Sequence, residues 1–138
     1  MDSPPIAGFR ERPHTADWAL DVWAPDLPGL LTQAALGMSA LMGLRTRSGP
    51  RAERVFELTY VDAESLLVGF LSELLYLINH DGLGFDRFDL RIGEGTLQAS
   101  VSGQPIEHLA KEIKAVTYHD LRVTATERGL AATIVFDV

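Results

Sequence analysis

Two aspartates and the last residue of the chain are the first candidates for chemistry. Asp17 follows His14-Thr15-Ala16 near the start, and Asp137 is the penultimate residue, so its side chain adjoins the α-carboxylate of Val138. Carboxylate oxygens are the ligands that hard divalent cations prefer. Without a cation, such carboxylates repel one another until one of them takes up a proton. These groups therefore predict a divalent-metal site, provided that the fold brings them together.

The segments that carry these aspartates alternate between apolar and polar residues, as half-buried strands do. In residues 17–23, Asp17 falls opposite the apolar face formed by Trp18, Leu20 and Val22. In residues 131–138, Asp137 falls opposite the apolar face formed by Ala132, Ile134, Phe136 and Val138. If these two strands are neighbours in the sheet, both aspartates and the terminal carboxylate converge on one cation.

Both aspartates also have an ordinary structural interpretation. At the start of a strand, Asp17 can accept hydrogen bonds from nearby backbone amides, as turn aspartates do. Asp137 lies at a chain end, and chain ends often fray in solvent. However, residues 133–136 are apolar and strand-forming up to the end, which favours a terminus that is held in place.

A second group of polar residues interrupts the apolar run 112–119. Lys114 and His119 could contact an anion or an acidic partner surface. A surface lysine is usually only solvated, and a histidine in such a run is more often structural than a ligand. Spacing alone leaves both interpretations open.

Composition restricts the class of protein. The 138 residues suffice for one domain, which we expect to span 1–138, and the absence of cysteine excludes disulfides and thiolate metal sites. The net charge of −7 opposes broad binding to a phosphate backbone but suits divalent cations or a basic protein partner. The basic stretch from Arg45 to Arg54 lacks interleaved aromatic residues, which favours a solvated loop over a nucleic-acid patch. Without a secretory signal or a bilayer-spanning apolar stretch, a cytoplasmic protein with no membrane contact is expected.

The hydrophobic pattern predicts an α+β fold, a mostly antiparallel sheet with two main helices packed on it. One helix should open at Pro25-Asp26-Leu27-Pro28, and the other should follow Asp62 as its N-cap. Residues 1–13 are interpreted as an extended lead-in, and residues 105–119 are ambiguous. The expected strands are residues 17–23, 54–61, 85–92, 96–102, 121–126 and 131–138.

Four segments together resemble the archease family, over most of the chain from about Gly8 to the C-terminus. Each is weak alone, but their order and spacing are specific. The resemblance implies an α+β fold related to strand–helix–strand–strand modules. Where family members usually carry a more acidic or aromatic lead-in, this chain has Arg10-Glu11-Arg12-Pro13. The four segments are His14-Thr15-Ala16-Asp17, the helix Leu66 to Leu77, Ile113-Lys114-Ala115-Val116-Thr117-Tyr118-His119 and Phe136-Asp137-Val138.

The resemblance implies an accessory protein rather than an enzyme. Archeases activate an RtcB-type RNA ligase, promoting its guanylylation and multiple turnover in tRNA splicing and RNA repair, so RNA is expected to be met only indirectly. By resemblance, Asp17 and Asp137 are metal ligands, and Val138 contributes as the last residue. The metal is expected to be calcium, with magnesium or manganese as other candidates. Lys114 is associated with activation, and His14 and His119 are further candidates for partner contact.

Two other classes of protein stay open. A metal-dependent phosphoester hydrolase could use the same carboxylates, with His14 or His119 as its base. A chaperone-like interaction module would instead use Asp17 and Asp137 only to hold the chain ends. The sequence contains no GxxxxGK[ST], GxSxG or HExxH motif, and no nucleophile with a nearby base stands out, which favours an accessory protein.

Overall fold

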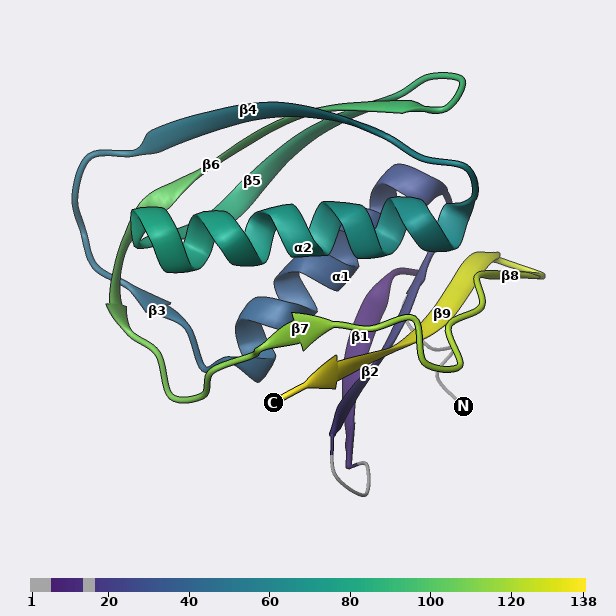
Figure 1. Cartoon of the computed structure of the whole chain (residues 1–138), viewed down its shortest axis with the longest axis horizontal. Helices are drawn as coiled ribbons and strands as arrows, with labels where there is room; N and C mark the ends of the chain where they lie inside the picture. Colours follow the sequence, from purple (N-terminus) through teal and green to yellow (C-terminus); the bar gives the residue numbers. More distant parts are fainter. Residues whose placement is uncertain (1–5, 14–16) are drawn as a thin grey trace.

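The computed structural model describes residues 6–13 and 17–138, and it places two helices between two antiparallel sheets (Figure 1). The α+β fold predicted from the sequence is confirmed. The elements in chain order are β1 (Gly8–Pro13), β2 (Trp18–Ala24), α1 (Leu27–Leu41), β3 (Arg45–Thr46), β4 (Ala52–Thr59), α2 (Ala63–Asp81), β5 (Leu83–Ile92), β6 (Thr96–His108), β7 (Ala115–Val116), β8 (Thr124–Thr126) and β9 (Gly129–Asp137).

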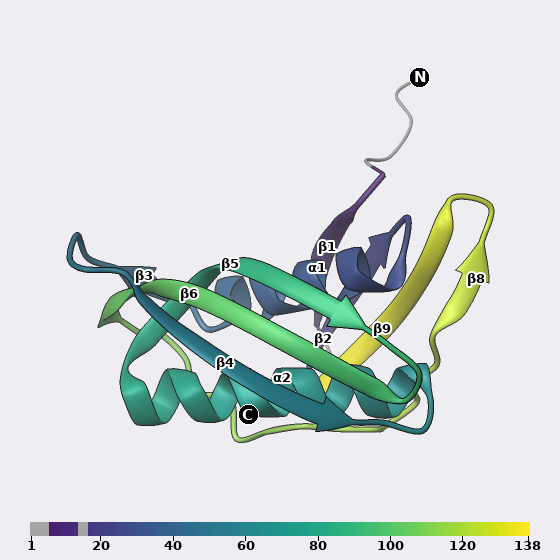
Figure 2. The same cartoon turned by 90° about the horizontal axis from the view of Figure 1, so that it is seen from above.

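The first sheet has the strand order β1-β2-β9-β7, with β8 also paired to β9. The second has the order β3-β6-β4, with β5 also paired to β6. Figures 1 and 2 show the second sheet covering one side of the helical layer and the first sheet covering the other. The first sheet combines strands from both ends of the sequence, so it is the element that brings distant residues together.

Both helices begin at the residues that local chemistry favours. Asp26 caps α1 by accepting a hydrogen bond from the backbone N–H of Gly29 at 2.8 Å. Asp62 caps α2 in a capping box, in which its side chain accepts from the N–H of Ser65 and the Ser65 hydroxyl oxygen accepts from the N–H of Asp62. Gly82 ends α2 with a left-handed φ of 65°.

The core lies between the sheets and is mostly aliphatic. The two helices contribute most of its largest fully buried side chains, and β2, β6 and β9 add the facing layers. Because apolar surface gains about 25 cal/mol for each Å² removed from water, this layer is the main source of stability. Its largest fully buried members are Phe70, Phe136, Leu20, Leu30, Leu31, Met38, Met42, Leu66, Leu67, Leu71, Leu74 and Leu97.

Two expectations about the elements were incomplete. The interpretation of residues 1–13 as a lead-in missed β1, which pairs with β2 along its whole length, and whose Phe9 packs against the core. The ambiguous stretch 105–119 contains the end of β6 and the short strand β7. No helix within 6–13 and 17–138 is long and apolar enough to cross a membrane.

Candidate functional site

The strands that carry Asp17 and Asp137 are neighbours in the first sheet. β2 and β9 pair antiparallel, with Trp18 opposite Phe136 and Leu20 opposite Ile134. The pairing ends at Trp18, and Asp17 is the bend residue directly before it, so Asp17 lies at the same end of the sheet as Asp137. Asp137 alternates with the buried Phe136, so its side chain lies on the exposed face of β9.

Lys114 joins this end of the sheet from the other side of β9. β7 pairs with β9 so that Ala115 lies opposite Asp137. The backbone N–H of Lys114 donates to the carbonyl oxygen of Asp137 at 2.7 Å. The side chains of Lys114 and Asp137 are exposed, whereas Val138 is half-buried and packs against the core. The neighbouring strands β2, β9 and β7 thus bring the segments before Trp18, around Ala115 and at Asp137 to one sheet (Figure 1).

The sequence also named two histidines, His119 and His14, as candidates for partner contact. His119 is exposed, and its Nε2 lies 3.2 Å from the Oδ2 of its neighbour Asp120. The backbone N–H of His119 donates to the hydroxyl oxygen of Thr117 at 3.2 Å, and that hydroxyl donates to the carbonyl oxygen of Val135 at 2.8 Å. His119 therefore sits beyond the end of β7. The candidate His14 lies outside the described residues.

Within 6–13 and 17–138, no group of three or more His, Cys, Asp or Glu side chains could hold a metal ion. Asp17 and Asp137 are two candidate carboxylates at this end of the sheet, and Val138 follows Asp137 directly. An all-oxygen set of this kind fits Ca²⁺, Mg²⁺ or Mn²⁺ and does not fit metals that need sulfur ligands.

Asp21, further along β2 on the same face, sits in a network of hydrogen bonds. Its carboxylate accepts from the hydroxyl of Thr133 at 2.6 Å, from Arg10 at 3.1 Å and from Arg12 at 3.4 Å. Burial by itself would raise the pKa of Asp21, but the bonds from Thr133 and Arg10 and the charge of Arg12 together hold its pKa below the ordinary value. Asp21 is therefore a charged structural residue at neutral pH.

The arginine-rich stretch and the pair His80-Asp81 belong to the structure of the second sheet and α2. Arg51 pairs with Asp86, and Arg54 donates to Asp81 at 2.8 Å. His80 Nδ1 lies 2.7 Å from Asp81 Oδ1. Hydrogen bonds from His80 and Arg54 lower the pKa of Asp81. His80 and Asp81 thus have a structural role at the C-terminal end of α2, directly before Gly82, where Asp81 also links the helix to Arg54 of β4.

Sequence reasoning missed one group of polar residues on the outward face of the first sheet. Arg10 and Arg12 come from β1, while Arg122 and Arg128 flank β8. The signal was available in part, because Arg10 and Arg12 are two residues apart and so share one face of a strand. It could be used only if residues 8–13 were identified as a strand.

Comparison with known proteins agrees with the fold. The Archease protein family (MTH1598/TM1083) matches residues 9–138. An archease of Methanosarcina barkeri is 35% identical over 135 residues, which cover 91% of this chain and 92% of the relative. An archease of Methanosarcina acetivorans is 38% identical over 135 residues, with the same coverage.

Two solved structures share the architecture. Protein 1598 of Methanobacterium thermoautotrophicum, solved in solution, superposes with a TM-score of 0.70 at 27% identity and covers 95% of this chain and 99% of its own. A Thermotoga maritima crystal structure, described as an archease and possible chaperone, has a TM-score of 0.71 at 23% identity and covers 100% of this chain and 98% of its own. The latter likeness bears on the fold alone. The match across nearly the whole sequence and the identity to curated relatives lead to one conclusion: this chain belongs to the archease family.

Proposed function

We propose that this protein is a metal-binding accessory protein that activates an RtcB-type RNA ligase, in tRNA splicing or RNA repair in the cytoplasm. The observation that carries the proposal is the meeting of Asp17, Asp137 and Lys114 at one end of the first sheet. An anionic pair beside an exposed lysine can hold a cation and meet a charged partner at the same place. None of these three side chains is an evident nucleophile, which favours an accessory role over catalysis.

In this proposal Asp17, Asp137 and Val138 hold the cation, with Ca²⁺ the first candidate and Mg²⁺ or Mn²⁺ the others. The bound cation relieves the repulsion among the carboxylates and adds positive charge at the sheet end. The protein's own contribution is rigidity. β9 is hydrogen-bonded on both sides, to β2 and to β7, so the carboxylates start from a preformed arrangement.

Lys114 is proposed to act on the ligase. Its backbone is tied to Asp137, so the position of its Cα is fixed relative to the anionic pair. Its side chain is exposed and can reach an anionic group of a docked partner, such as a nucleotide phosphate. We propose that this end of the sheet docks at or near the active site of the ligase and promotes guanylylation between turnovers.

A chaperone-like function is a second candidate, because the described part of the chain shows no metal-holding group of three or more side chains, and a chaperone needs none. In that case the protein would hold a partner in its folded form, and the sheet end would serve only to secure the chain termini. The two functions differ in what they require. Activation needs the carboxylates and Lys114, whereas holding a partner does not.

Multiple-turnover RNA ligation by the cognate ligase tests the proposal, with GTP and a divalent metal present and this protein at a substoichiometric amount. Activation predicts that a small amount converts one round of ligation into many. Asp17→Ala should leave a single round, while Glu94→Gln, an exposed acidic residue at the β5–β6 turn, should behave as the wild type. Equal ligation with and without the protein at every ratio would reject activation, and protection of the ligase from aggregation by both variants would favour the chaperone.

A further inference from the structure

The outward face of the second sheet is a shallow trough along β6. β6 runs between β4 and β5, and Figure 2 looks onto the side of these strands that faces away from the helices. A hollow of about 300 Å³ lies over the three strands. The side chains on its walls are exposed, so no other part of the described chain covers it. We call this face the β6 trough, and its members are Glu53, Val55 and Glu57 of β4, Gln98, Ser100 and Ser102 of β6, and Arg87, Asp89 and Arg91 of β5.

The pairing of the strands separates the charges of the trough by sign. Glu53 and Glu57 lie on β4, whereas Arg87 and Arg91 lie at the matching positions of β5. Glu53 and Arg87 pair with the same residue of β6, and so do Glu57 and Arg91. Because neighbouring strands are about 4.8 Å apart, the backbones of the two members of each row are about 10 Å apart. The trough thus has an acidic wall on β4 and a basic wall on β5.

Most of this charge has no partner within the chain. Among the described residues, the side chains of Glu53, Glu57 and Arg87 form no ion pair, and neither row closes into one across the floor. Arg91 lies 3.8 Å from Asp89, which is beyond hydrogen-bonding distance, and both side chains are exposed. The walls are therefore open to charges from another molecule.

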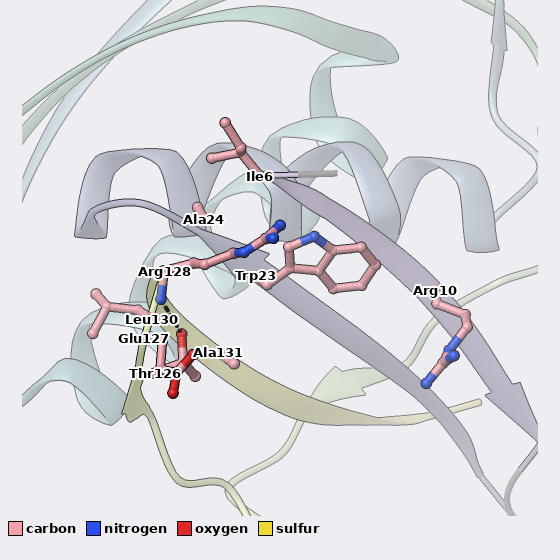
Figure 3. A pocket seen from close by; sticks show the side chains of 9 residues that line it. All are labelled: Ile6, Arg10, Trp23, Ala24, Thr126, Glu127, Arg128, Leu130 and Ala131. Atoms are coloured by element: carbon pink, nitrogen blue, oxygen red, sulfur yellow. Dashed lines mark hydrogen bonds between the residues drawn. The ribbon is translucent and has the colours of Figure 1, made fainter. Parts of the chain in front are cut away.

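The outward face of the first sheet differs in this respect. Its hollow of about 510 Å³ has Trp23 and Arg10 in its wall (Figure 3). Arg10 and Arg12 both donate to Asp21, at 3.1 and 3.4 Å. Charges that are already paired offer less to a new partner, so the β6 trough is the stronger candidate for an interface.

A second copy of the chain fits both walls at once if it is rotated by half a turn about the direction of β6. This rotation sets β4 of each copy over β5 of the other and keeps the position of each residue along the strands. Glu53 then faces Arg87 of the other copy, and Glu57 faces Arg91. Facing sheets pack about 10 Å apart, a gap that a glutamate and an arginine bridge from opposite sides. Rotation about an axis across the strands would set glutamate against glutamate instead.

We propose that the β6 trough is the interface of a symmetric dimer of this chain, held by ion pairs of Glu53 with Arg87 and of Glu57 with Arg91 between the copies. A two-fold interface requires a self-complementary patch of this kind. A partner of one charge would satisfy one wall and oppose the other, so a second copy is the better occupant. Burial of Val55, which is 71% exposed in the single chain, adds apolar area.

The size and polarity of the trough predict a weak dimer. Three strands of about eight residues present roughly 400–500 Å² per copy, which places the interface among those of transient complexes. Ion pairs at such an interface weaken as the salt concentration rises. The second sheet lies on the other side of the helical layer from the first sheet, which carries Asp137, so the dimer leaves the proposed metal site open (Figure 1).

Sedimentation equilibrium of the full chain tests this proposal over about 10 µM to about 1 mM protein. The wild type should show a reversible monomer–dimer equilibrium whose dimer fraction falls between about 0.1 and about 1 M salt. Glu53→Arg/Glu57→Arg makes both walls basic, and Arg87→Glu/Arg91→Glu makes both acidic. Each variant alone should dimerise at least about tenfold more weakly than the wild type, because like charges then face one another. An equimolar mixture of the two should form a heterodimer, because each wall then meets its opposite.

Glu112→Arg/Glu127→Arg is the matched control, because it makes the same change in charge as Glu53→Arg/Glu57→Arg at exposed residues outside the trough. It should dimerise as the wild type does. The proposal fails if the wild type stays monomeric at about 1 mM protein and about 0.1 M salt. It also fails if the two reversed variants do not pair when mixed, or if either alone dimerises as well as the wild type. Ligase activation is measured separately and does not depend on this result.

Discussion

The backbone N–H of Lys114 donates a hydrogen bond of 2.7 Å to the carbonyl oxygen of Asp137. This bond fixes a lysine of the β7 segment beside an aspartate of the last strand. β2 pairs with the opposite side of β9 as far as Trp18 opposite Phe136, so Asp17, the residue before Trp18, lies at the same end of the sheet. One sheet end therefore holds the two carboxylates and the lysine on which the proposed activation rests.

Metal affinity should depend on both carboxylates of the sheet end. Asp137→Asn and Asp17→Asn each replace an anionic oxygen ligand by a neutral one, so the affinity for Ca²⁺ should fall by about tenfold or more. Isothermal titration calorimetry measures this directly. Glu94→Gln makes the same change in charge at an exposed turn and should leave the affinity unchanged. An equal loss in Glu94→Gln would mean that only the general negative charge matters.

Stability should rise when the metal is bound. A cation that binds only the folded chain adds about 2.7 kcal/mol to the free energy of unfolding at a concentration one hundred times its Kd. The midpoint of thermal unfolding should therefore be higher in Ca²⁺ than in EDTA for the wild type, and nearly the same in both for Asp17→Asn/Asp137→Asn. A Ca²⁺-dependent rise of equal size in that double variant would place the metal elsewhere.

Lys114 and Lys111 form a matched pair of lysines with different predicted roles. Lys114→Met keeps the backbone bond to Asp137 and should abolish ligase activation while leaving Ca²⁺ affinity and stability close to wild type. Lys111 Nζ lies 3.0 Å from the ring centroid of Trp18. Lys111→Met should therefore cost about 0.5–2 kcal/mol of stability and leave activation intact. Urea denaturation and ligation measured on both variants check the contrast, and the reverse pattern would remove Lys114 from the activation step.

Asp21 should make the stability of the protein depend on pH. Its pKa is lowered in the folded state, so its contribution is fully present above the unfolded pKa of about 3.9 and is lost as the pH falls through the folded pKa. Asp21→Asn should reduce the free energy of unfolding by about 1–3 kcal/mol at pH 7, because the partners Thr133 and Arg10 lose a charged acceptor. The difference from wild type should shrink below about pH 4. Urea denaturation at pH 7 and at about pH 3 measures it, and a difference that is equal at both would contradict the account.

Two glycines should respond to alanine in opposite directions. A Cβ atom at Gly103 would collide with the carbonyl oxygen of Gly84, which is backbone and cannot move aside, so Gly103→Ala should cost about 3 kcal/mol or more. At Gly69, inside α2, the nearest atom is Leu58 Cδ1 at 3.7 Å, an ordinary contact. Gly69→Ala should stabilise the protein by about 0.5–1 kcal/mol through the helix propensity. Thermal unfolding of the two variants tests both signs.

The features predicted from the sequence are those with local causes. The capping role of Asp62 and the helix start at Pro25 to Pro28 depend only on nearby residues, and both are confirmed. Strand alternation placed Leu20 and Ile134 on the buried face for the same reason. The pairing of β2 with β9, on which the candidate site depends, was stated only as a condition, because it joins residues more than one hundred positions apart.

The features that sequence analysis missed depend on tertiary contacts. β1 forms because β2 offers it a partner and α1 packs beside it, and neither is visible in Gly8 to Pro13 alone. The group formed by Arg10, Arg12, Arg122 and Arg128 needs β1, β2 and the β8–β9 hairpin together. Its four arginines are scattered in the sequence, whereas the visible cluster Arg45 to Arg54 is partly used in ion pairs within the second sheet and α2.

The most direct test of the central claim is transfer of labelled guanylate from GTP to the cognate ligase, followed at a limiting amount of this protein. The account predicts that the wild type and Glu94→Gln raise the rate of guanylylation and that Asp17→Asn/Asp137→Asn does not. The account is contradicted if the wild type leaves the rate unchanged, or if the double aspartate variant raises it as much as the wild type does.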